Sequence, residues 1–548
     1  MRGRDIDRNS VLKHYEGTGH LARKSLCQEL FESSEIYSDH VAVIADDAHL
    51  TYAQLEQSLC VFTEELRESG LSPGDHVLLQ LPNTAAYVVT LLALMRVGAI
   101  PTLLLPAHRE AEVAALCESL HPVAYIGGRD HLGFDTVAMV EAMGPGELGL
   151  KELWADNGPT HDKESSYRVL PGLFTAPIST KCSPPTKWPD PRSVALNLLS
   201  GGTTNMPKII PRIHEAYAYN TRAAAQCCGV GPDTVYLAVL STSHDFALAQ
   251  PGILGTLLSG GTVVLCTSAA FDEAFPAIAT HGVTLTALVP AVAQVWVEAA
   301  EWFPADFSSL ERIIIGAAAL NDGLGEAIQD RFGVRIHQGY GMGEGITTFT
   351  RIDDPPAVIL GTQGRPISDA DELVIDGPGG EPGEILEKGP YTFFGYEGNR
   401  DTPDCFTEDG FFRTGDRGYL TEDGNLVLCG RVVEQINRLG ENVSPSEVET
   451  LLSGTPGISA AAVFPMPDRA LGERTVAAIV AQPGVNRSAI LDDFLTRGVA
   501  RYKVPDQVIT VDEIPLINIG KVDKKKLRAL AAAQFTDRES EQAERTRP

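Results

Sequence analysis

Residues 76–106 read HVLLQLPNTAAYVVTLLALMRVGAIPTLLLP, and this stretch decides the fold class. The apolar run 76–83 ends at Pro and Asn, as a short strand does, and residues 86–98 predict a helix that Gly98 ends. Residues 100–106 predict the next strand. A strand, a helix and a strand at this spacing form a βαβ unit, which requires a parallel sheet with helices on its faces.

The same pattern returns farther along the chain, so the bulk of the protein is predicted to be α/β. Thr51 is the expected cap of a helix over 51–66. Further strands are predicted at 235–240, 262–266, 285–290 and 312–316, with helices between them.

The sequence pattern changes after Asp371, where short apolar runs separated by Gly/Pro turns predict antiparallel hairpins. We expect a large N-terminal domain, 1–432, with parallel α/β subdomains and a small β-barrel-like subdomain. A small α+β domain is expected at 433–533. Residues 534–548 have little apolar content and predict a disordered tail.

Charge and composition exclude several classes of function. Lys plus Arg number 44 and Asp plus Glu number 72, a formal net charge of −28. We therefore expect no nucleic-acid partner and no membrane partner, because both need a positive field. Nine cysteines without zinc-site spacing predict reduced thiols, and the N-terminus lacks the apolar segment of a secretory signal. The expected location is cytoplasmic.

The most informative motif is LLSGGTTNMPK at 198–208. Glycines let backbone N–H groups approach an anion, hydroxyls add donors, and Lys208 adds charge. It is not a Walker loop, since Pro207 precedes the lysine and no Ser or Thr follows it. The motif predicts a phosphate cradle of another kind, and the alternative is a flexible polar turn.

Further motifs follow in order: HQGYGMGEG (337–345), RTGD (413–416), GR (430–431), QINR (435–438) and PLINIGK (515–521). Together they resemble the adenylate-forming superfamily of acyl-CoA synthetases, peptide-synthetase adenylation domains and luciferases. The sequence is most similar to the stand-alone aryl-acid–AMP ligases, such as 2,3-dihydroxybenzoate–AMP ligase. That closer match lies in 105–109, 199–217, 286–296, 340–345 and 430–443.

The resemblance implies ATP and Mg²⁺ as cofactors and assigns residues to them. Glu344 would hold Mg²⁺, Asp416 would accept from the ribose hydroxyls, and Arg431 would assist at ribose or phosphate. The remaining ATP-binding residues that it implies are Ser200, Gly201, Gly202, Thr203, Thr204, Lys208, Gly316, Ala317, Tyr340, Gly341 and Met342.

Lys521 is the residue that the resemblance implies for the first half-reaction, bridging the acid carboxylate and the α-phosphate. Alternatively, Lys521, Lys524 and Lys525 form one solvated face. In the family the small domain is mobile and rotates between the two half-reactions. The usual hinge residue is Asp or Lys, whereas this chain has Val433 there.

The acid pocket is expected from the resemblance at 243–252, SHDFALAQPG, with Gly316, Ala318 and Gly339 nearby. Aryl-acid ligases usually have Asn and Ser where this chain has Asp245 and Ala249. Ionised Asp only accepts hydrogen bonds, which favours an aryl acid with an ortho amino group or a ring nitrogen. Salicylate and 2,3-dihydroxybenzoate remain alternatives. Phe246 would line the pocket, and His244 would either gate the reacting carboxylate or be structural.

The predicted function is ATP-dependent adenylation of an aryl acid, with transfer to the phosphopantetheine thiol of a separate carrier protein in siderophore or nonribosomal peptide biosynthesis. An aryl- or acyl-CoA ligase is the alternative within enzymes. A non-catalytic nucleotide-binding protein on the same fold is the alternative outside them.

Overall fold

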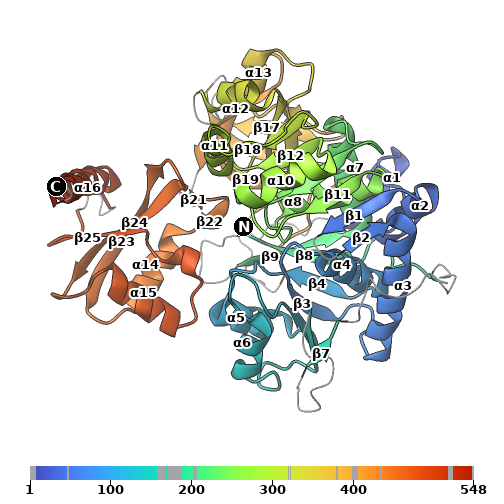
Figure 1. The fold of residues 1–548 in the computed structure, drawn as a ribbon, viewed down its shortest axis with the longest axis horizontal. Coiled ribbons are helices and arrows are strands. Elements are labelled where there is room, and N and C mark those ends of the chain that lie inside the picture. The colour runs from blue at the N-terminus through green and yellow to red at the C-terminus, as the bar shows by residue number, and fades with distance from the viewer. Residues whose placement is uncertain are drawn as a thin grey trace. The chain divides into compact units, whose positions relative to one another are not determined.

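The structure is a computed structural model that describes residues 8–45, 48–156, 167–170, 185, 187–200, 207–318, 320, 323–377, 381–397, 405–431, 435–515 and 522–545. The chain forms two compact units, coloured along the chain in Figure 1. Of the described residues, the first unit holds those from 8 to 431 apart from 107–115 and Pro207. The second holds those from 435 onward together with 107–115 and Pro207.

The βαβ unit predicted at 76–106 is confirmed. Strand β3 (His76–Gln80) is followed by α4 (Ala85–Val97) and β4 (Ile100–Leu103), and β3 pairs with β4 in parallel. Gly98 ends α4 with a φ of 88°, a conformation that glycine adopts without strain. All residues of α4 except Ala86 are buried, which explains its continuous apolar sequence.

These strands belong to a seven-stranded sheet of order β7-β6-β5-β3-β4-β8-β9. Every neighbouring pair is parallel except β8 and β9, which form an antiparallel hairpin. The other strands are β5 (Ala124–Gly127), β6 (Glu152–Ala155), β7 (Arg168–Val169), β8 (Val194–Ser200) and β9 (Lys208–Ile213).

The strands predicted between 235 and 316 lie in a nine-stranded sheet of order β16-β15-β14-β13-β12-β10-β11-β1-β2. Its centre is parallel and both ends carry antiparallel strands. Its strands are β1 (Val41–Ala45), β2 (Ala48–Thr51), β10 (Val235–Ala238), β11 (Thr262–Leu265), β12 (Leu285–Leu288), β13 (Arg312–Ile315), β14 (Arg335–Met342), β15 (Gly345–Phe349) and β16 (Arg365–Pro366).

Helices cover both faces of this sheet, as a parallel sheet requires (Figure 1). Ile314 packs into a core shared with α3 and α4, whereas its neighbours Ile313 and Ile315 pack into a second core with α10, α11 and α12. The helices of this unit are α1 (Arg8–Gly17), α2 (Leu26–Ile36), α3 (Tyr52–Glu68), α6 (Thr136–Met143), α7 (His214–Cys227), α8 (Asp245–Ala249), α9 (Gly252–Leu258), α10 (Phe271–His281), α11 (Pro290–Ala299), α12 (Leu324–Phe332) and α13 (Pro356–Gly361), while α5 (Glu110–Leu120) spans the boundary at 115/116.

The hairpin region after Asp371 forms a four-stranded antiparallel sheet, as predicted. Its order is β17 (Glu372–Asp376), β18 (Gly383–Lys388), β19 (Phe412–Leu420) and β20 (Leu426–Arg431). Among the described strands, β17 and β20 are edges and do not pair with each other, so the sheet is open. In the described residues, this open antiparallel sheet is what corresponds to the predicted small β-barrel-like subdomain.

The second unit is α+β, with a five-stranded sheet. It contains β21 (Ile436–Arg438), β22 (Glu441–Val443), α14 (Pro445–Ser453), β23 (Ile458–Asp468), β24 (Gly472–Ala481), α15 (Arg487–Thr496), the 3₁₀ helix η1 (Arg501–Lys503), β25 (Gln507–Thr510) and α16 (Lys524–Arg545).

Helix α16 contradicts the predicted tail. Leu527 and Ala531 are buried in the core of the second unit, and the helix continues to Arg545. The segment QFTDRESEQAER is polar, but its Glu, Gln, Ala and Arg residues favour helix. The prediction of disorder is therefore wrong for 534–545, and residues 546–548 lie outside the described residues.

Two further expectations concern cysteines and membranes. Among the cysteines that the structure describes, Cys60 is disulfide-bonded, and the free ones are Cys27, Cys117, Cys227, Cys228, Cys266, Cys405 and Cys429. The expectation of reduced thiols is thus wrong for Cys60, and the spacing of the cysteines in the sequence did not indicate its disulfide bond.

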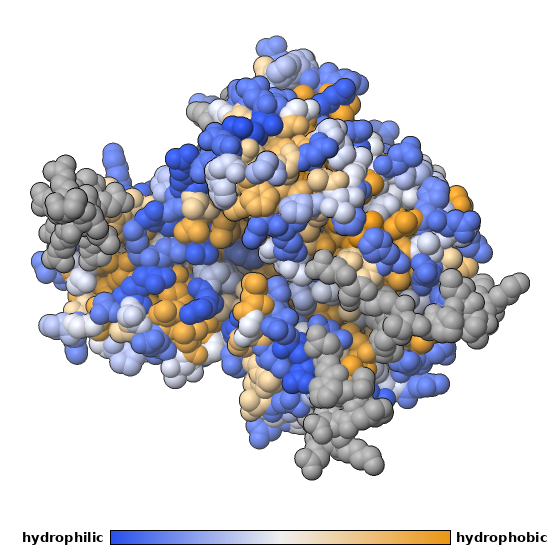
Figure 2. Space-filling view, in the orientation of Figure 1, coloured by the Kyte–Doolittle hydropathy of each residue, from blue (hydrophilic) through white to orange (hydrophobic). Residues whose placement is uncertain are grey.

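In the part of the chain that the structure describes, no helix combines the length and apolar character needed to cross a membrane. The face in Figure 2 mixes hydrophilic and hydrophobic residues.

Candidate active site

The β14–β15 hairpin carries five of the predicted site residues, namely Gly339, Tyr340, Gly341, Met342 and Glu344. Residues 335–338 of β14 pair in parallel with β13, and from Gly339 the strand pairs antiparallel with β15. A Cβ at Gly339 would lie 2.3 Å from the ring of Phe349, so the strand needs glycine at this point. The hairpin therefore forms the antiparallel end of the nine-stranded sheet, with Tyr340 on β14 and Glu344 at the turn before β15.

The predicted ribose residue Asp416 lies between two partners. Asp416 on β19 is opposite Arg431 on β20 in the strand register, and Arg431 Nε lies 2.8 Å from Asp416 Oδ1. Tyr340 donates its hydroxyl to Asp416 Oδ2 at 2.7 Å. Burial raises the pKa of Asp416, and the Arg431 charge opposes that rise. The structure thus brings three predicted nucleotide residues together on two sheets.

The predicted metal residue Glu344 is buried and accepts a hydrogen bond from Tyr396 Oη at 2.8 Å. Burial raises the pKa of Glu344, while the charges of Lys208 and Arg431 lower it. Lys208 Nζ lies 4.8 Å from the centroid of the Tyr396 ring. Glu344 and Lys208 thus both contact Tyr396. Lys208 is the first residue of β9 and is opposite Ser200 of β8 in the strand register.

The predicted phosphate loop and the lysine predicted for the first half-reaction lie outside the described residues. Gly201, Gly202, Thr203, Thr204 and Lys521 lie outside the described residues, as does the hinge position Val433. Their roles remain predictions.

Asp245 begins α8 and is held by two neutral donors. Its Oδ1 accepts from Tyr217 Oη at 2.6 Å, and its Oδ2 accepts from Gln250 Nε2 at 2.9 Å. Gln250 Oε1 in turn accepts from Thr347 Oγ1 on β15 at 3.1 Å. Burial and the adjacent Asp245 charge raise the pKa of Tyr217 well above its usual value, so its hydroxyl remains a donor at neutral pH.

A second feature of the expected acid pocket is the contact between Phe246 and Gly316. A Cβ at Gly316 would lie 3.0 Å from the Phe246 ring, so glycine permits this close approach. Ala318, two residues on, is exposed, and so is Ala317, which has a left-handed φ of 64°. Backbone strain of this kind at a non-glycine residue is common at binding sites.

The remaining predicted residues divide into three environments. His244 is half-buried at the start of α8. Gly341 is exposed, and Met342 packs beside the core of the four-stranded sheet. Ala249 is fully buried in the main hydrophobic core. The prediction that Ala249 contacts the acid is not supported, because a side chain without exposed surface has no face toward a ligand.

Sequence reasoning assigned no role to Arg212, Tyr217, Gln250 or Tyr396. Arg212 and Tyr217 lie in PRIHEAY, a segment that carries the family resemblance, and Gln250 lies near the end of the pocket motif. For these three residues, their place inside recognised motifs was the available signal. Arg212, Tyr217 and Tyr396 have partners on distant segments, so no local pattern could assign those contacts.

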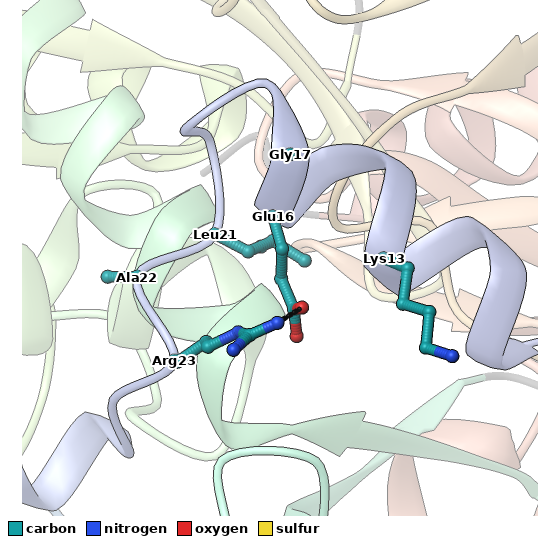
Figure 3. Close-up of a pocket in the computed structure, with 6 residues that line it drawn as sticks. All are labelled: Lys13, Glu16, Gly17, Leu21, Ala22 and Arg23. Carbon is teal, nitrogen blue, oxygen red and sulfur yellow. Dashed lines mark hydrogen bonds and ion pairs between the residues drawn. The ribbon is translucent and has the colours of Figure 1, made fainter.

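Other candidate sites are weaker. Among the described residues, no group of three or more His, Cys, Asp or Glu could hold a metal ion. A hollow of about 400 Å³ beside α1 is lined by Lys13, Glu16, Gly17, Leu21, Ala22 and Arg23. Figure 3 shows Glu16 pointing toward Arg23, and Arg23 Nη2 lies 2.5 Å from Glu16 Oε2. The residues that line this hollow include none of those predicted to bind ATP or the acid.

Comparison with known proteins places this arrangement in a family. Residues 30–397 match the AMP-binding enzyme family, and residues 447–521 match the AMP-binding enzyme C-terminal domain. The chain is 36% identical to 2,3-dihydroxybenzoate-AMP ligase of Bacillus subtilis over 537 residues, 95% of this chain and 96% of that protein. It is 38% identical to salicyl-AMP ligase / salicyl-S-ArCP synthetase of Mycobacterium tuberculosis over 526 residues, 94% and 92% of the two chains.

A solved structure agrees with these relatives. The apo structure of MbtA from Mycobacterium smegmatis matches with a TM-score of 0.71 and 35% identity, covering 95% of this chain and 97% of that one. The resemblance predicted from the motifs is confirmed, and this chain belongs to the AMP-binding enzyme family of adenylate-forming ligases.

Proposed function

We propose that this enzyme joins an aryl carboxylate to the α-phosphate of ATP and then transfers the aryl group to a thiol. In the first step a carboxylate oxygen bonds to the α-phosphorus and the bond to pyrophosphate breaks. In the second step sulfur bonds to the carbonyl carbon and AMP leaves. The observation that carries the proposal is the β14–β15 hairpin, which hydrogen-bonds both to Asp416 and to Gln250, one of the two residues that hold Asp245.

Asp416 is proposed to bind the ribose. A buried carboxylate with two oxygens can accept from both ribose hydroxyls, and Arg431 and Tyr340 hold it in one orientation. Ser200 and Lys208 begin and end the segment proposed to hold the outer phosphates. Lys208 supplies a positive charge near Glu344.

Asp416→Asn is expected to raise the KM for ATP about tenfold to a hundredfold, the cost of losing hydrogen bonds to a charged group. The Michaelis constant for the aryl acid should change much less. The measurement is ATP–pyrophosphate exchange at varied ATP. Asp423→Asn, an exposed position in the turn of the same β19–β20 hairpin, is the matched control. An unchanged ATP KM in the Asp416 variant would contradict the ribose role.

Mg²⁺ is proposed at Glu344. Mg²⁺ usually binds through one or two carboxylates together with substrate phosphates, so a single buried carboxylate near Lys208 fits this cation. When bound, Mg²⁺ neutralises charge on the phosphate oxygens. Tyr396 fixes the Glu344 carboxylate from the protein side through the hydrogen bond to its Oε1.

The acid is proposed to bind beside Asp245 and Phe246. Each Asp245 oxygen already accepts one hydrogen bond from a neutral donor, so the carboxylate keeps further lone pairs for a substrate group. A substrate amine, or a ring nitrogen that carries a proton, would donate a hydrogen bond to it. Relatives named for salicylate and 2,3-dihydroxybenzoate support the aryl class.

In a pyrophosphate-exchange panel, anthranilate and picolinate analogues are expected to exceed salicylate and 2,3-dihydroxybenzoate. Asp245→Asn should shift the ratio of kcat/KM values toward the hydroxybenzoates by about tenfold, because the amide restores a donor. Asp233→Asn, at an exposed position before β10, should leave the ratio unchanged. Preference of the unaltered enzyme for salicylate or 2,3-dihydroxybenzoate would contradict the nitrogen-bearing substrate.

The acceptor is proposed to be the phosphopantetheine thiol of a separate carrier protein in the cytoplasm, in siderophore or nonribosomal peptide biosynthesis. The name of the Mycobacterium tuberculosis relative, salicyl-S-ArCP synthetase, supports this acceptor. Transfer assays with carrier protein and with CoA separate it from the CoA-ligase alternative. Absence of exchange with every acid of a broad panel would favour a non-catalytic nucleotide-binding protein.

A further inference from the structure

Arg212 is a buried cation that contacts two parts of the site. It lies on β9 and is only 2% exposed. Its Nη1 donates to the carbonyl oxygen of Gly343 at 2.6 Å, and its guanidinium carbon lies 5.2 Å from the centroid of the Tyr217 ring. Its Nη2 has no hydrogen-bond partner among the residues that the structure describes.

The first contact bears on Glu344. Gly343 immediately precedes Glu344, so a donor on its carbonyl fixes the backbone of the turn. The turn is also tightly packed, since a Cβ at Gly343 would lie 3.1 Å from Ile210 and 3.2 Å from Leu198. Phe393 N donates to the Glu344 carbonyl at 2.7 Å from the other side. Arg212 therefore helps to fix the backbone position from which the Glu344 side chain extends.

The second contact bears on Asp245. A guanidinium on the face of a tyrosine is attracted by the ring and restricts the orientation of that ring. The hydroxyl of this same ring donates to Asp245 Oδ1 at 2.6 Å. Orienting the Tyr217 ring thus orients the donor that holds the pocket carboxylate.

We propose that Arg212 is a positioning residue that couples the phosphate carboxylate Glu344 to the acid-pocket carboxylate Asp245. The inference rests on the roles proposed above for these two carboxylates. Burial of a charge is costly unless it is engaged, and Arg212 is engaged by a carbonyl on one side and a ring on the other. A second connection, from Gln250 to Thr347, joins the same two regions without using Arg212.

The geometry requires arginine rather than lysine. A planar guanidinium can donate in its plane to the Gly343 carbonyl while its face covers the Tyr217 ring. A lysine ammonium is a compact charge and would favour one of these contacts over the other. Arg212→Lys should therefore restore only part of what Arg212→Met removes.

The test compares Arg212→Met with Arg312→Met. Arg312 is a similarly buried arginine on β13 that donates to the carbonyls of Cys228 and Gly229, and it contacts none of the proposed site residues. Both variants should lose thermal stability. Only Arg212→Met should raise the dissociation constants of salicylate and anthranilate, measured by calorimetry without ATP, by about tenfold. Only this variant should also raise the half-saturating Mg²⁺ concentration in pyrophosphate exchange, again by about tenfold. Arg212→Lys supplies the same readouts if Arg212→Met does not fold.

Tyr217→Phe then isolates the acid side. It should weaken acid binding without changing the Mg²⁺ requirement, and adding Arg212→Met should weaken acid binding less than the two separate effects combined. Additive effects, or an Arg212→Met profile equal to that of Arg312→Met, would overturn the coupling. If Glu344→Gln and Asp245→Asn leave activity and selectivity intact, the proposed carboxylate roles fail instead, which distinguishes the two failures.

Discussion

Lys521→Ala should slow aryl-AMP formation about 10²–10³-fold, the usual cost of removing a donor aimed at developing charge. Two anions must meet in this step, the acid carboxylate and the α-phosphate, and the lysine ammonium is predicted to bridge them. The measurement is single-turnover formation of aryl-AMP. Transfer from chemically prepared aryl-AMP to the acceptor thiol should persist, because that step needs no new bond to the phosphorus.

The control for this prediction is Lys525→Ala, since Lys525 is exposed on α16, four residues along the chain. It should retain full activity in both half-reactions. Equal losses in the two lysine variants would support the alternative of a solvated lysine face. Equal losses of the two half-reactions in Lys521→Ala would argue that the residue acts on folding rather than on adenylation.

Glu344→Gln should lower kcat/KM for adenylation by about 10²–10³-fold, because an amide keeps the volume of the side chain but removes its charge. Gln can still accept from Tyr396, so the turn should keep its hydrogen bond and the protein its stability. Excess Mg²⁺ should recover part of the rate. The measurement is pyrophosphate exchange across a Mg²⁺ titration.

Glu326→Gln, at an exposed position on α12, is the matched control and should titrate like the unaltered enzyme. If Glu344→Gln also retained the ordinary rate and Mg²⁺ dependence, the carboxylate would have only a structural role at the hairpin turn.

The parts of the fold that follow local patterns were predictable. The apolar runs at 76–106 predicted β3, α4 and β4, and Thr51 was correctly expected to cap its helix. Such features depend on residues a few positions apart, which the chain displays directly. The prediction of disorder for 534–545 was wrong because it rested on the low hydrophobicity of this segment and ignored the helix propensity of its residues.

The amino-acid sequence by itself determined the family and the α/β class, and it singled out Asp416, Arg431, Glu344 and Asp245 as candidate site residues, because each lies in a short motif. Only the tertiary structure decided their partners. Arg212 meets Gly343 across 131 residues, and Tyr340 meets Asp416 across 76. Contacts of this range depend on the order and register of the strands within the sheets. That order is set by the burial of whole sheet faces against helices, and residues that are neighbours in the sequence do not determine it.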